Sequence, residues 1–333
     1  MQHRLPRLLT LALALVMAIS LAACGSKTDS SQGGQPSASA SVKPSASASV
    51  SPSATAAADG KITVEDAQGT VTLAKKPERI VAMDFSFTDM LVTLGVQPVG
   101  VADDGDAGLF MDAVKSQLKE YKSVGSRYEP NIELISSLKP DLIIVDINKH
   151  KNAIPQLKAI APLLVLNDYT ADYDQMLKNF MITAKAVGKE AEGKKRLDEH
   201  QAKMTAAKAK IKTAGMLVLP AVVNPTGFFG HSDHSYSGSM LKMLGFTDPL
   251  KNDAAYPQLS LEQLVETNPQ ALFLMPTDKV TIVDQWKTNP LWQKIAAVAN
   301  NKVFTVERRD WSLSRGMLGS EKIADDILKV LGA

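Results

Sequence analysis

The sequence predicts an α/β protein of two Rossmann-like lobes that are joined by a single long helix, with a ligand cleft between the lobes. In both halves of the 333-residue chain, short apolar runs rich in β-branched residues alternate with helical stretches. Continuous apolar strands between helices are typical of a parallel sheet that is covered on both faces. A long charged stretch, residues 189–213, separates the two halves. The hydrophobic content of 45% is enough for one large or two medium cores.

Residues 1–23 have the pattern of a secretory signal peptide. Basic Arg4 and Arg7 precede an apolar run, Leu8 to Ile19, and small residues follow it. A run of this length is too short to cross a bilayer as a stable helix. Removing this segment lowers the basic count from 37 to 35, which equals the 35 acidic residues. The balanced charge argues against nucleic acid as a partner.

Cys24 follows this segment and is the only cysteine of the chain. The tetrapeptide Leu21-Ala22-Ala23-Cys24 resembles the lipobox of bacterial lipoproteins, and the resemblance implies that the Cys24 thiol is acylated and begins the mature chain. We therefore expect lipid anchoring at the outer face of the cytoplasmic membrane, facing the outside of the cell. An ordinary signal peptide with a chance cysteine is the alternative.

Residues 24–60 are expected to be a disordered tether. They consist almost entirely of Ser, Ala, Gly, Pro and Gln, and Pro-Ser-Ala-Ser-Ala occurs at both 36–40 and 44–48. Such a composition cannot bury enough apolar surface to offset its ordering entropy, and its prolines keep it extended.

Residues 61–188 are expected to form the N-terminal lobe. The expected strands are 79–83, 98–101, 141–145 and 163–166. One expected helix runs from Ser86, whose hydroxyl would cap it, to Leu94 before Gly95, and a second runs from Ile132 to Leu138 before Pro140.

Residues 189–213 are expected to form the interlobe helix. Its apolar residues Leu197, Met204 and Ile211 are seven apart and form one narrow seam, while most other positions are charged or Ala. A helix this polar usually bridges two bodies, although a coiled-coil arm is an alternative.

Residues 214–333 are expected to form the C-terminal lobe. The expected strands are 216–219, 271–275 and 303–306, and the expected helices are 240–244, 261–267 and 319–331. A cleft between two such lobes is the natural place for a ligand.

Several separate motifs resemble those of one family. They are residues 98–104, Val124-Gly125-Ser126-Arg127, Pro130-Asn131-Ile132-Glu133, residues 138–144, His231 with Gly238-Ser239, and Trp311 with Arg315-Gly316. Together they resemble the siderophore-binding lipoproteins of ABC importers, which are class III periplasmic binding proteins, and most of all the ferric-dicitrate branch. The resemblance implies capture of a ferric siderophore (ferric citrate or a citrate-based hydroxamate chelate) and its delivery to an ABC permease. It implies no bond chemistry and no cofactor, since the ferric siderophore is the transported ligand, and we expect a monomer.

Binding such an anionic chelate requires fixed cations and flat apolar walls. Arg127 and Arg315 lie in matched motifs and can grip carboxylates with a bidentate fork. Lys149 and His150 follow a predicted strand, at the end where α/β clefts bind ligands. The remaining candidates are Trp311, which would share a helical face with Arg315 if that segment is helical, and Phe85, Phe228 and His231 as walls. For each residue outside the matched arginines, a solvated charge or a packed aromatic is an equal alternative.

Leu313 stands where the dicitrate pattern has a second basic residue. A citrate-based hydroxamate chelate is therefore an alternative to ferric dicitrate as the ligand.

Glu133 and Glu262 have equivalent positions in the two lobes. Each lies in the first turn of a predicted helix, where a carboxylate suits the helix dipole, and Ser260 is the expected cap of the second helix. The family resemblance implies that such a pair docks on arginines of the permease, a role that is compatible with helix capping.

The sequence is also compatible with other functions. His231 and His234 flank Asp233 and could ligate Zn or Mn, so direct metal binding is an alternative, as is haem or corrinoid binding. An enzyme or a structural surface lipoprotein would be of another class. The sequence contains no Gly-x-Ser-x-Gly, Walker or His-Glu-x-x-His motif, so we expect no enzyme activity.

Overall fold

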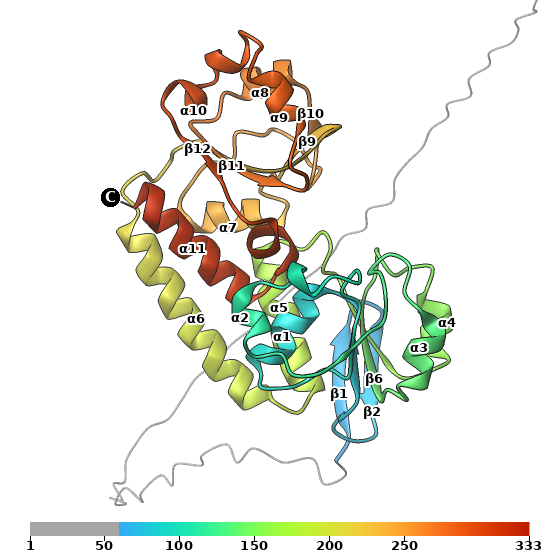
Figure 1. Ribbon diagram of the computed structural model, residues 1–333. Coiled ribbons are helices and arrows are strands. Elements are labelled where there is room, and N and C mark those ends of the chain that lie inside the picture. The colour runs from blue at the N-terminus through green and yellow to red at the C-terminus, as the bar shows by residue number, and fades with distance from the viewer. Residues whose placement is uncertain (1–59, 333) are drawn as a thin grey trace, which may run out of the picture. The chain divides into compact units, whose positions relative to one another are not determined.

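The computed structural model describes residues 60–332, and Ala56–Ala333 form one compact unit (Figure 1). The expected signal peptide, Cys24 and nearly all of the expected tether lie outside the described residues. Within the described part of the chain, no helix is both long and apolar enough to cross a membrane.

The N-terminal lobe is built on a five-stranded sheet whose strands are all parallel. Its order is β5-β4-β3-β6-β7. The strands are β3 (Ile80–Ala82), β4 (Gly100–Val101), β5 (Lys122–Ser123), β6 (Leu142–Asp146) and β7 (Leu163–Leu166). Every residue of β3, β6 and β7 is buried, as expected for a sheet that is covered on both faces.

A hairpin precedes this sheet, and helices connect its strands. The hairpin of β1 (Ile62–Asp66) and β2 (Gly69–Leu73) covers the free edge of β7, because Asp66 Oδ2 and the Ala67 amide bond to the Val165 backbone. The helices are α1 (Phe85–Thr93), a 3₁₀ turn (Ala107–Leu109), α2 (Asp112–Lys115), α3 (Ile132–Ser137), α4 (Ile154–Lys158) and α5 (Tyr173–Ala186).

The C-terminal lobe has a second five-stranded sheet, in the order β10-β9-β8-β11-β12. Strands β8, β11 and β12 are parallel, whereas β9 and β10 are antiparallel to their neighbours. The strands are β8 (Val218–Asn224), β9 (Gly227–Gly230), β10 (Gln258–Leu259), β11 (Ala271–Pro276) and β12 (Val303–Thr305). The two-residue turn between β8 and β9 forces the antiparallel pairing, since a parallel pair requires a long crossover.

The helices of this lobe are short except for the last. They are α7 (Tyr236–Leu244), α8 (Leu261–Thr267), α9 (Ile282–Trp286), a 3₁₀ turn (Trp292–Lys294), α10 (Ala296–Ala299), a π-helical turn (Arg309–Leu313) and α11 (Met317–Leu331).

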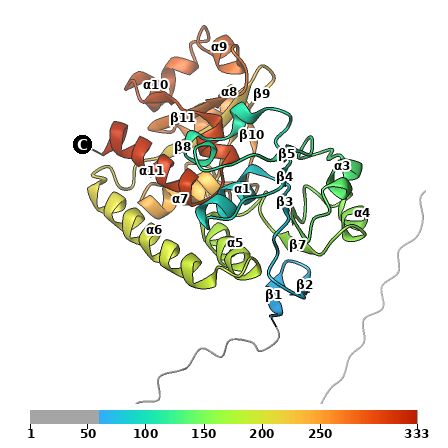
Figure 2. The ribbon, with the colours of Figure 1, turned by 60° about the horizontal axis from the view of Figure 1, so that its bottom comes forward.

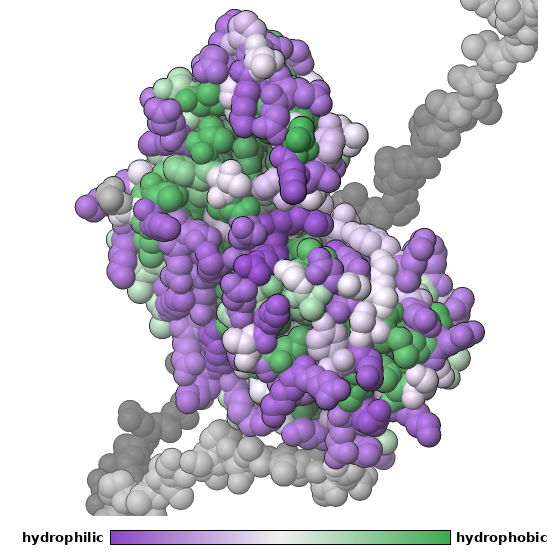
Figure 3. All heavy atoms as spheres, in the orientation of Figure 1, coloured by the Kyte–Doolittle hydropathy of each residue, from purple (hydrophilic) through white to green (hydrophobic). Residues whose placement is uncertain are grey.

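The lobes are joined by α6 (Glu190–Lys210), which packs against α5, α7 and α11 (Figures 1 and 2). Of the predicted seam, Met204 and Ile211 are buried, and the side of α6 seen in Figure 3 is hydrophilic. Helix α6 is therefore amphipathic, with one narrow apolar face, and it links the two lobes. A single core cluster includes Phe87 of α1, Met204 of α6 and Ile323 of α11, so the junction of the lobes is a packed core.

Helix α1 begins differently from the expectation. Its cap is Asp84, which accepts from the Phe85 amide, and Ser86 lies inside the helix with its hydroxyl donated to Asp168. Ser86 is thus drawn into a tertiary contact, and the preceding carboxylate takes the capping role.

Glu321 of α11 connects three side chains of α6 at the lobe junction. It accepts from Arg196 at 2.6 Å, bonds His200 at 2.9 Å and pairs with Lys203 at 3.4 Å. These hydrogen bonds and Arg196 lower the pKa of Glu321 to about 2, against the opposing effect of burial.

Glu321→Gln should therefore destabilise the protein at pH 7, by roughly 2 kcal/mol. The folded pKa lies below the ordinary value, so the carboxylate stabilises above about pH 4.5 and this contribution is lost as the pH falls through about 2. Thermal unfolding at pH 7 and pH 3 should show the deficit at pH 7 and a smaller one at pH 3. A deficit that is the same at both pH values would contradict the stabilising role of the ionised Glu321 carboxylate.

Candidate binding site between the lobes

Charged side chains converge where the parallel strands of the N-terminal lobe end. Asp84 follows β3, Asp104 follows β4, Arg127 follows β5, Lys149 follows β6 and Asp168 follows β7. Because parallel strands end at one edge of the sheet, these side chains are brought to one place, the edge at which open α/β sheets bind ligands.

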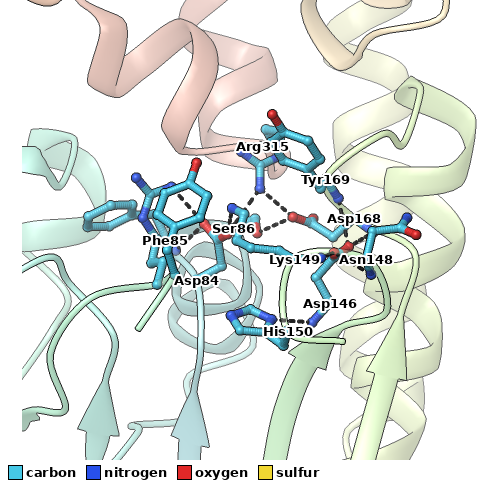
Figure 4. A network of polar contacts seen from close by, with 12 residues as sticks. Asp84, Phe85, Ser86, Asp146, Asn148, Lys149, His150, Asp168, Tyr169 and Arg315 are labelled. Atoms are coloured by element: carbon cyan, nitrogen blue, oxygen red, sulfur yellow. Dashed lines mark hydrogen bonds and ion pairs between the residues drawn. The ribbon is translucent and has the colours of Figure 1, made fainter. Parts of the chain in front are cut away.

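Asp84 lies at the centre of this group (Figure 4). It is fully buried and pairs with three cations: Lys149, Arg127 at 3.5 Å and Arg315 at 3.3 Å. Burial alone would raise its pKa, but the charges of Lys149, Arg315 and Arg127 outweigh it and hold the pKa well below the usual range. Asp84 therefore stays ionised and fixes three cations around one carboxylate.

Arg127 is held in one orientation by Asp104. Its Nε and Nη2 donate to Asp104 Oδ2 at 3.0 and 2.7 Å, and its amide donates to Oδ1. The guanidinium lies over the Phe85 ring, 4.7 Å from the centroid. This arrangement aims a rigid, stacked arginine at the cleft.

Asp146, the last residue of β6, organises the two neighbouring loops. Its Oδ1 accepts from the Asn148 and Lys149 amides, and its Oδ2 accepts from the Asp168 and Tyr169 amides. Figure 4 shows these loops meeting at Asp146. The Lys149 ammonium consequently lies over the rings of Tyr128 and Tyr169, at 5.3 and 5.0 Å.

The C-terminal lobe adds Arg315, Arg308 and His231. Arg315 Nη2 reaches across to Asp168 Oδ2 at 2.5 Å, so the two lobes share an ion pair at the site. Burial, Arg315 and Arg308 lower the pKa of His231 to about 3, so its imidazole is neutral at pH 7. Its Nδ1 bonds the Ser237 hydroxyl at 2.6 Å.

Arg308 differs from the other three cations of the site. Among the described residues it alone of these four cations has no ion pair with a carboxylate. Its buried Nε has no hydrogen-bond partner, which is also true of the Arg315 Nε. Burial and the charge of Arg127 lower its pKa, and the charges of Tyr128 and Asp104 only partly oppose this. Such a cation favours an anionic ligand.

These residues surround a cavity of about 170 Å³ between the lobes. Its lining consists of Arg127, Tyr128, Lys149, Tyr169, Val222, Phe229, His231, Tyr256, Arg308, Ser312, Leu313 and Arg315. A larger cavity of about 660 Å³, which includes Leu274, Lys279 and Trp292, is lined by the C-terminal lobe alone. We place the candidate site in the smaller cavity because four cations from both lobes meet there.

The structure brings four of the predicted ligand-binding residues to this cavity. Arg127, Lys149, His231 and Arg315 line it, and Phe85 lies beneath Arg127 instead of forming a wall. The residues that sequence reasoning missed are Arg308, the carboxylates Asp84, Asp104 and Asp168, and the aromatic walls Tyr128, Tyr169, Phe229 and Tyr256.

Three predicted residues lie elsewhere. His150 is buried, and its Nδ1 accepts from the Asp146 amide below the site. Phe228 points to the other side of β9 and stacks on Trp286, so its neighbour Phe229 lines the cavity. These two residues are parts of the scaffold.

Trp311 is also a core residue. It is fully buried, stacks on Phe273 with centroids 4.7 Å apart, and donates its Nε1–H to Asp326 at 3.0 Å. The expected shared helical face with Arg315 does not form, because the helical turn ends at Leu313 and is π-helical.

Glu133 and Glu262 each occupy the second position of their helix, α3 and α8, and both are exposed. The caps are Asn131, which accepts from the Leu134 amide, and Ser260, which forms a capping box with Gln263. Other residues thus provide the caps, and hydrogen bonds with its own backbone amide and with Ser260 lower the pKa of the Glu262 carboxyl.

The two histidines of the possible metal pair have separate surroundings. His231 is buried against Tyr256 and Ser237, whereas His234 is exposed beside Asp233. Within residues 60–332, no group of three or more His, Cys, Asp or Glu side chains is placed to hold a metal ion.

Replacing Arg308 by glutamine should weaken binding of an anionic chelate by on the order of tenfold without loss of stability. Arg308 lies near Arg127 and Arg315 and has no carboxylate partner to leave behind. Calorimetric titration and thermal unfolding check both parts, and exposed Lys279→Gln is the matched control. A fall in Tm with unchanged affinity would contradict this role.

Comparisons with known proteins agree with this architecture. Residues 80–309 match the model of the family described as periplasmic binding protein. The chain belongs to this family. Among its relatives, the Fe(3+)-citrate-binding protein YfmC of Bacillus subtilis is 43% identical over 267 residues, which are 80% of this chain and 84% of YfmC. The Fe(3+) dicitrate-binding periplasmic protein FecB of Escherichia coli is 36% identical over 269 residues, covering 80% of this chain and 89% of FecB.

A solved structure of the family has the same fold. SirA of Staphylococcus aureus, complexed with staphyloferrin B, superposes with a TM-score of 0.72 at 27% identity, covering 81% of this chain and 98% of SirA. The two-lobed α/β fold of this periplasmic binding protein is therefore the one predicted from the sequence.

Proposed function

We propose that the protein captures a ferric chelate with citrate-type carboxylates outside the cytoplasmic membrane and delivers it to an ABC permease. The observation that carries this proposal is the cavity with four cations from both lobes, of which Arg308 has no carboxylate partner. Guanidinium groups bind carboxylates in bidentate geometry, and a fixed excess of cations selects an anionic ligand. The similarity to YfmC and FecB supports citrate as the chelating group.

Arg308 also bears on the choice between ferric citrate and a citrate-based hydroxamate. The sequence has Leu313 where a second basic residue was expected, and Leu313 lines the cavity. Arg308 supplies a cation from the same segment, which supports ferric citrate itself. The tyrosines and Phe229 supply the flat walls.

Binding should involve a small movement of the lobes. A cavity of about 170 Å³ is smaller than the several hundred Å³ that small-molecule sites usually have, so the rim has to open for a whole chelate. The Arg309–Asp112 ion pair at 3.0 Å and the hydrogen bond from the Tyr256 hydroxyl to the Tyr169 carbonyl both join the two lobes. The packed junction at α6 and α11 resists wide hinge opening.

For delivery, we propose that Glu133 and Glu262 dock on the permease. They are exposed, one on each lobe, at equivalent positions of α3 and α8. We further propose that a lipid on Cys24 holds the protein at the membrane and that it acts as a monomer without enzymatic turnover.

A thermal-shift panel tests the ligand class. The soluble fragment 56–333 is heated with ferric citrate, a ferric citrate-hydroxamate, a ferric catecholate, haem, Mn²⁺ or Zn²⁺. A saturable rise in Tm with the citrate-based chelates is expected, because a ligand that binds only the folded state stabilises it. A rise only with free metals would favour direct metal binding, and a rise only with haem would also overturn the proposal.

A further inference from the structure

The first residues of α11 connect the candidate site to the lobe junction. Arg315 precedes Gly316, the cap residue of α11, and this helix has no side-chain cap of its own. Its first turn is instead contacted by Asp89 of α1, a helix of the other lobe. The Leu318 and Gly319 amides donate to the two carboxylate oxygens of Asp89, at 3.5 and 3.3 Å.

Gly316 allows this close approach. A Cβ at this position would overlap the Asp89 carboxylate, so a larger residue would force that carboxylate away from the start of α11. The Gly316 carbonyl in turn accepts from the hydroxyls of Tyr236 and Ser320. The residue next to Arg315 is therefore fixed on several sides.

Helix α1 thus contacts the 315–319 segment at two places. At its start, Asp84 pairs with the Arg315 side chain, and Ser86 bonds Asp168, the other partner of Arg315. About one turn further along, Asp89 binds the amides of α11. One helix of the N-terminal lobe sets both the backbone and the side-chain position of a C-terminal-lobe cation.

We propose that Asp89 is a positioning residue for ligand binding: by capping α11 across the lobe junction, it holds Arg315 at the cavity. This inference rests on the proposed function for its effect on affinity. The capping contact itself does not require a ligand.

The ionisation of Asp89 makes its contribution to the stability of the fold depend on pH. Its neighbours are Thr93 on α1, the amides of α11, the phenol of Tyr236 on α7 and the more distant Arg196 on α6. Burial raises the pKa of Asp89 to about 7, and the hydrogen bonds only partly oppose it. A raised pKa means that the neutral form fits the folded state better, so stability is fully present below about pH 4 and falls as the pH rises through about 7.

The test compares Asp89→Ala and the near-isosteric Asp89→Asn with wild type, using fragment 56–333, which contains all three core clusters. Exposed Asp325→Asn on α11 is the control. Asp89→Ala should weaken ferric citrate binding by on the order of tenfold at a temperature where all variants are folded, because two amides lose their acceptor. Asp89→Asn, which keeps an acceptor oxygen, should stay within about threefold of wild type.

A double-mutant cycle separates positioning from a general structural role. If Asp89 acts through Arg315, Asp89→Ala should have no further effect on affinity in an Arg315→Gln background. Additive effects, or a lower Tm with unchanged affinity, would overturn the proposal.

Two readouts need no ligand. The Tm of Asp89→Asn relative to wild type should rise between pH 5 and pH 8, and a crystal structure of Asp89→Ala should show Arg315 displaced from Asp168. An unmoved Arg315 would overturn the inference even if ferric citrate binds. If the wild-type protein binds no chelate, the proposed function is overturned. The pH dependence of Tm and the position of Arg315 would then still test whether Asp89 positions Arg315.

Discussion

Asp84→Asn should destabilise the protein by about 3–5 kcal/mol, the range measured when one partner of a buried ion pair is removed. The substitution keeps the shape of the side chain and an acceptor for the Phe85 amide. It removes the one carboxylate that Lys149, Arg127 and Arg315 share in a fully buried position. Three cations would then remain close together with less counter-charge. Chemical denaturation at pH 7 measures the loss.

The pH dependence provides an internal control. The pKa of Asp84 is held below its usual range, so its carboxylate stabilises above about pH 4 and the contribution is lost as the pH falls. The difference between wild type and Asp84→Asn should be constant from pH 8 to pH 5 and shrink below pH 4. Exposed Asp253→Asn should change nothing. A change below about 1 kcal/mol for Asp84→Asn would refute its role as the common counter-ion.

Combining Glu133→Ala with Glu262→Ala should abolish iron uptake in cells and leave the Kd for ferric citrate unchanged. Both carboxylates are exposed and lie outside the cavity lining, so their removal should affect docking alone. Radioactive iron uptake and calorimetry on the purified double variant measure the two quantities. Each single variant should retain part of the transport, since one lobe can still dock.

The matched control is Glu120→Ala with Glu266→Ala, which removes one exposed glutamate from each lobe away from the starts of α3 and α8. This pair should transport normally. If it loses uptake as strongly as the first pair, net charge explains the effect and specific docking does not. An equal loss of affinity in the first pair would place these glutamates in the binding site.

Much of the fold was predictable because β3, β6, β7 and β11 are continuous apolar runs and α6 is too polar to be buried. The polar strand β5 and the hairpin of β1 and β2 were not predicted. Strand β7 and helix α8 have the predicted bounds; β3 and β6 differ by one residue at each end, and β11 differs by one residue at its end. The antiparallel β9 and β10 were missed because Gly227-Phe228-Phe229-Gly230 is short and bounded by glycines. Such a segment pairs through its neighbours and has little strand pattern of its own.

The site was predictable where a residue follows a strand or lies in a matched motif. Lys149, Arg127 and Arg315, which line the candidate cavity, were predicted in this way. Asp84 follows β3 as Lys149 follows β6, so the same rule could have found it. Asp168 could not be predicted as a partner of Arg315, because the two residues are 147 positions apart in the sequence and meet only through the contact between the lobes. The prediction for Trp311 was wrong because it assumed an α-helical spacing in a π-helical turn.

Calorimetric titration of fragment 56–333 with ferric citrate, and with iron-free citrate, Mn²⁺ and Zn²⁺ as separate titrants, tests the proposed function directly. The proposed function predicts saturable binding of ferric citrate at one site and no saturable binding of the free metals. Saturable binding of Mn²⁺ or Zn²⁺, with none for ferric citrate, would contradict it and direct attention to His231 and His234.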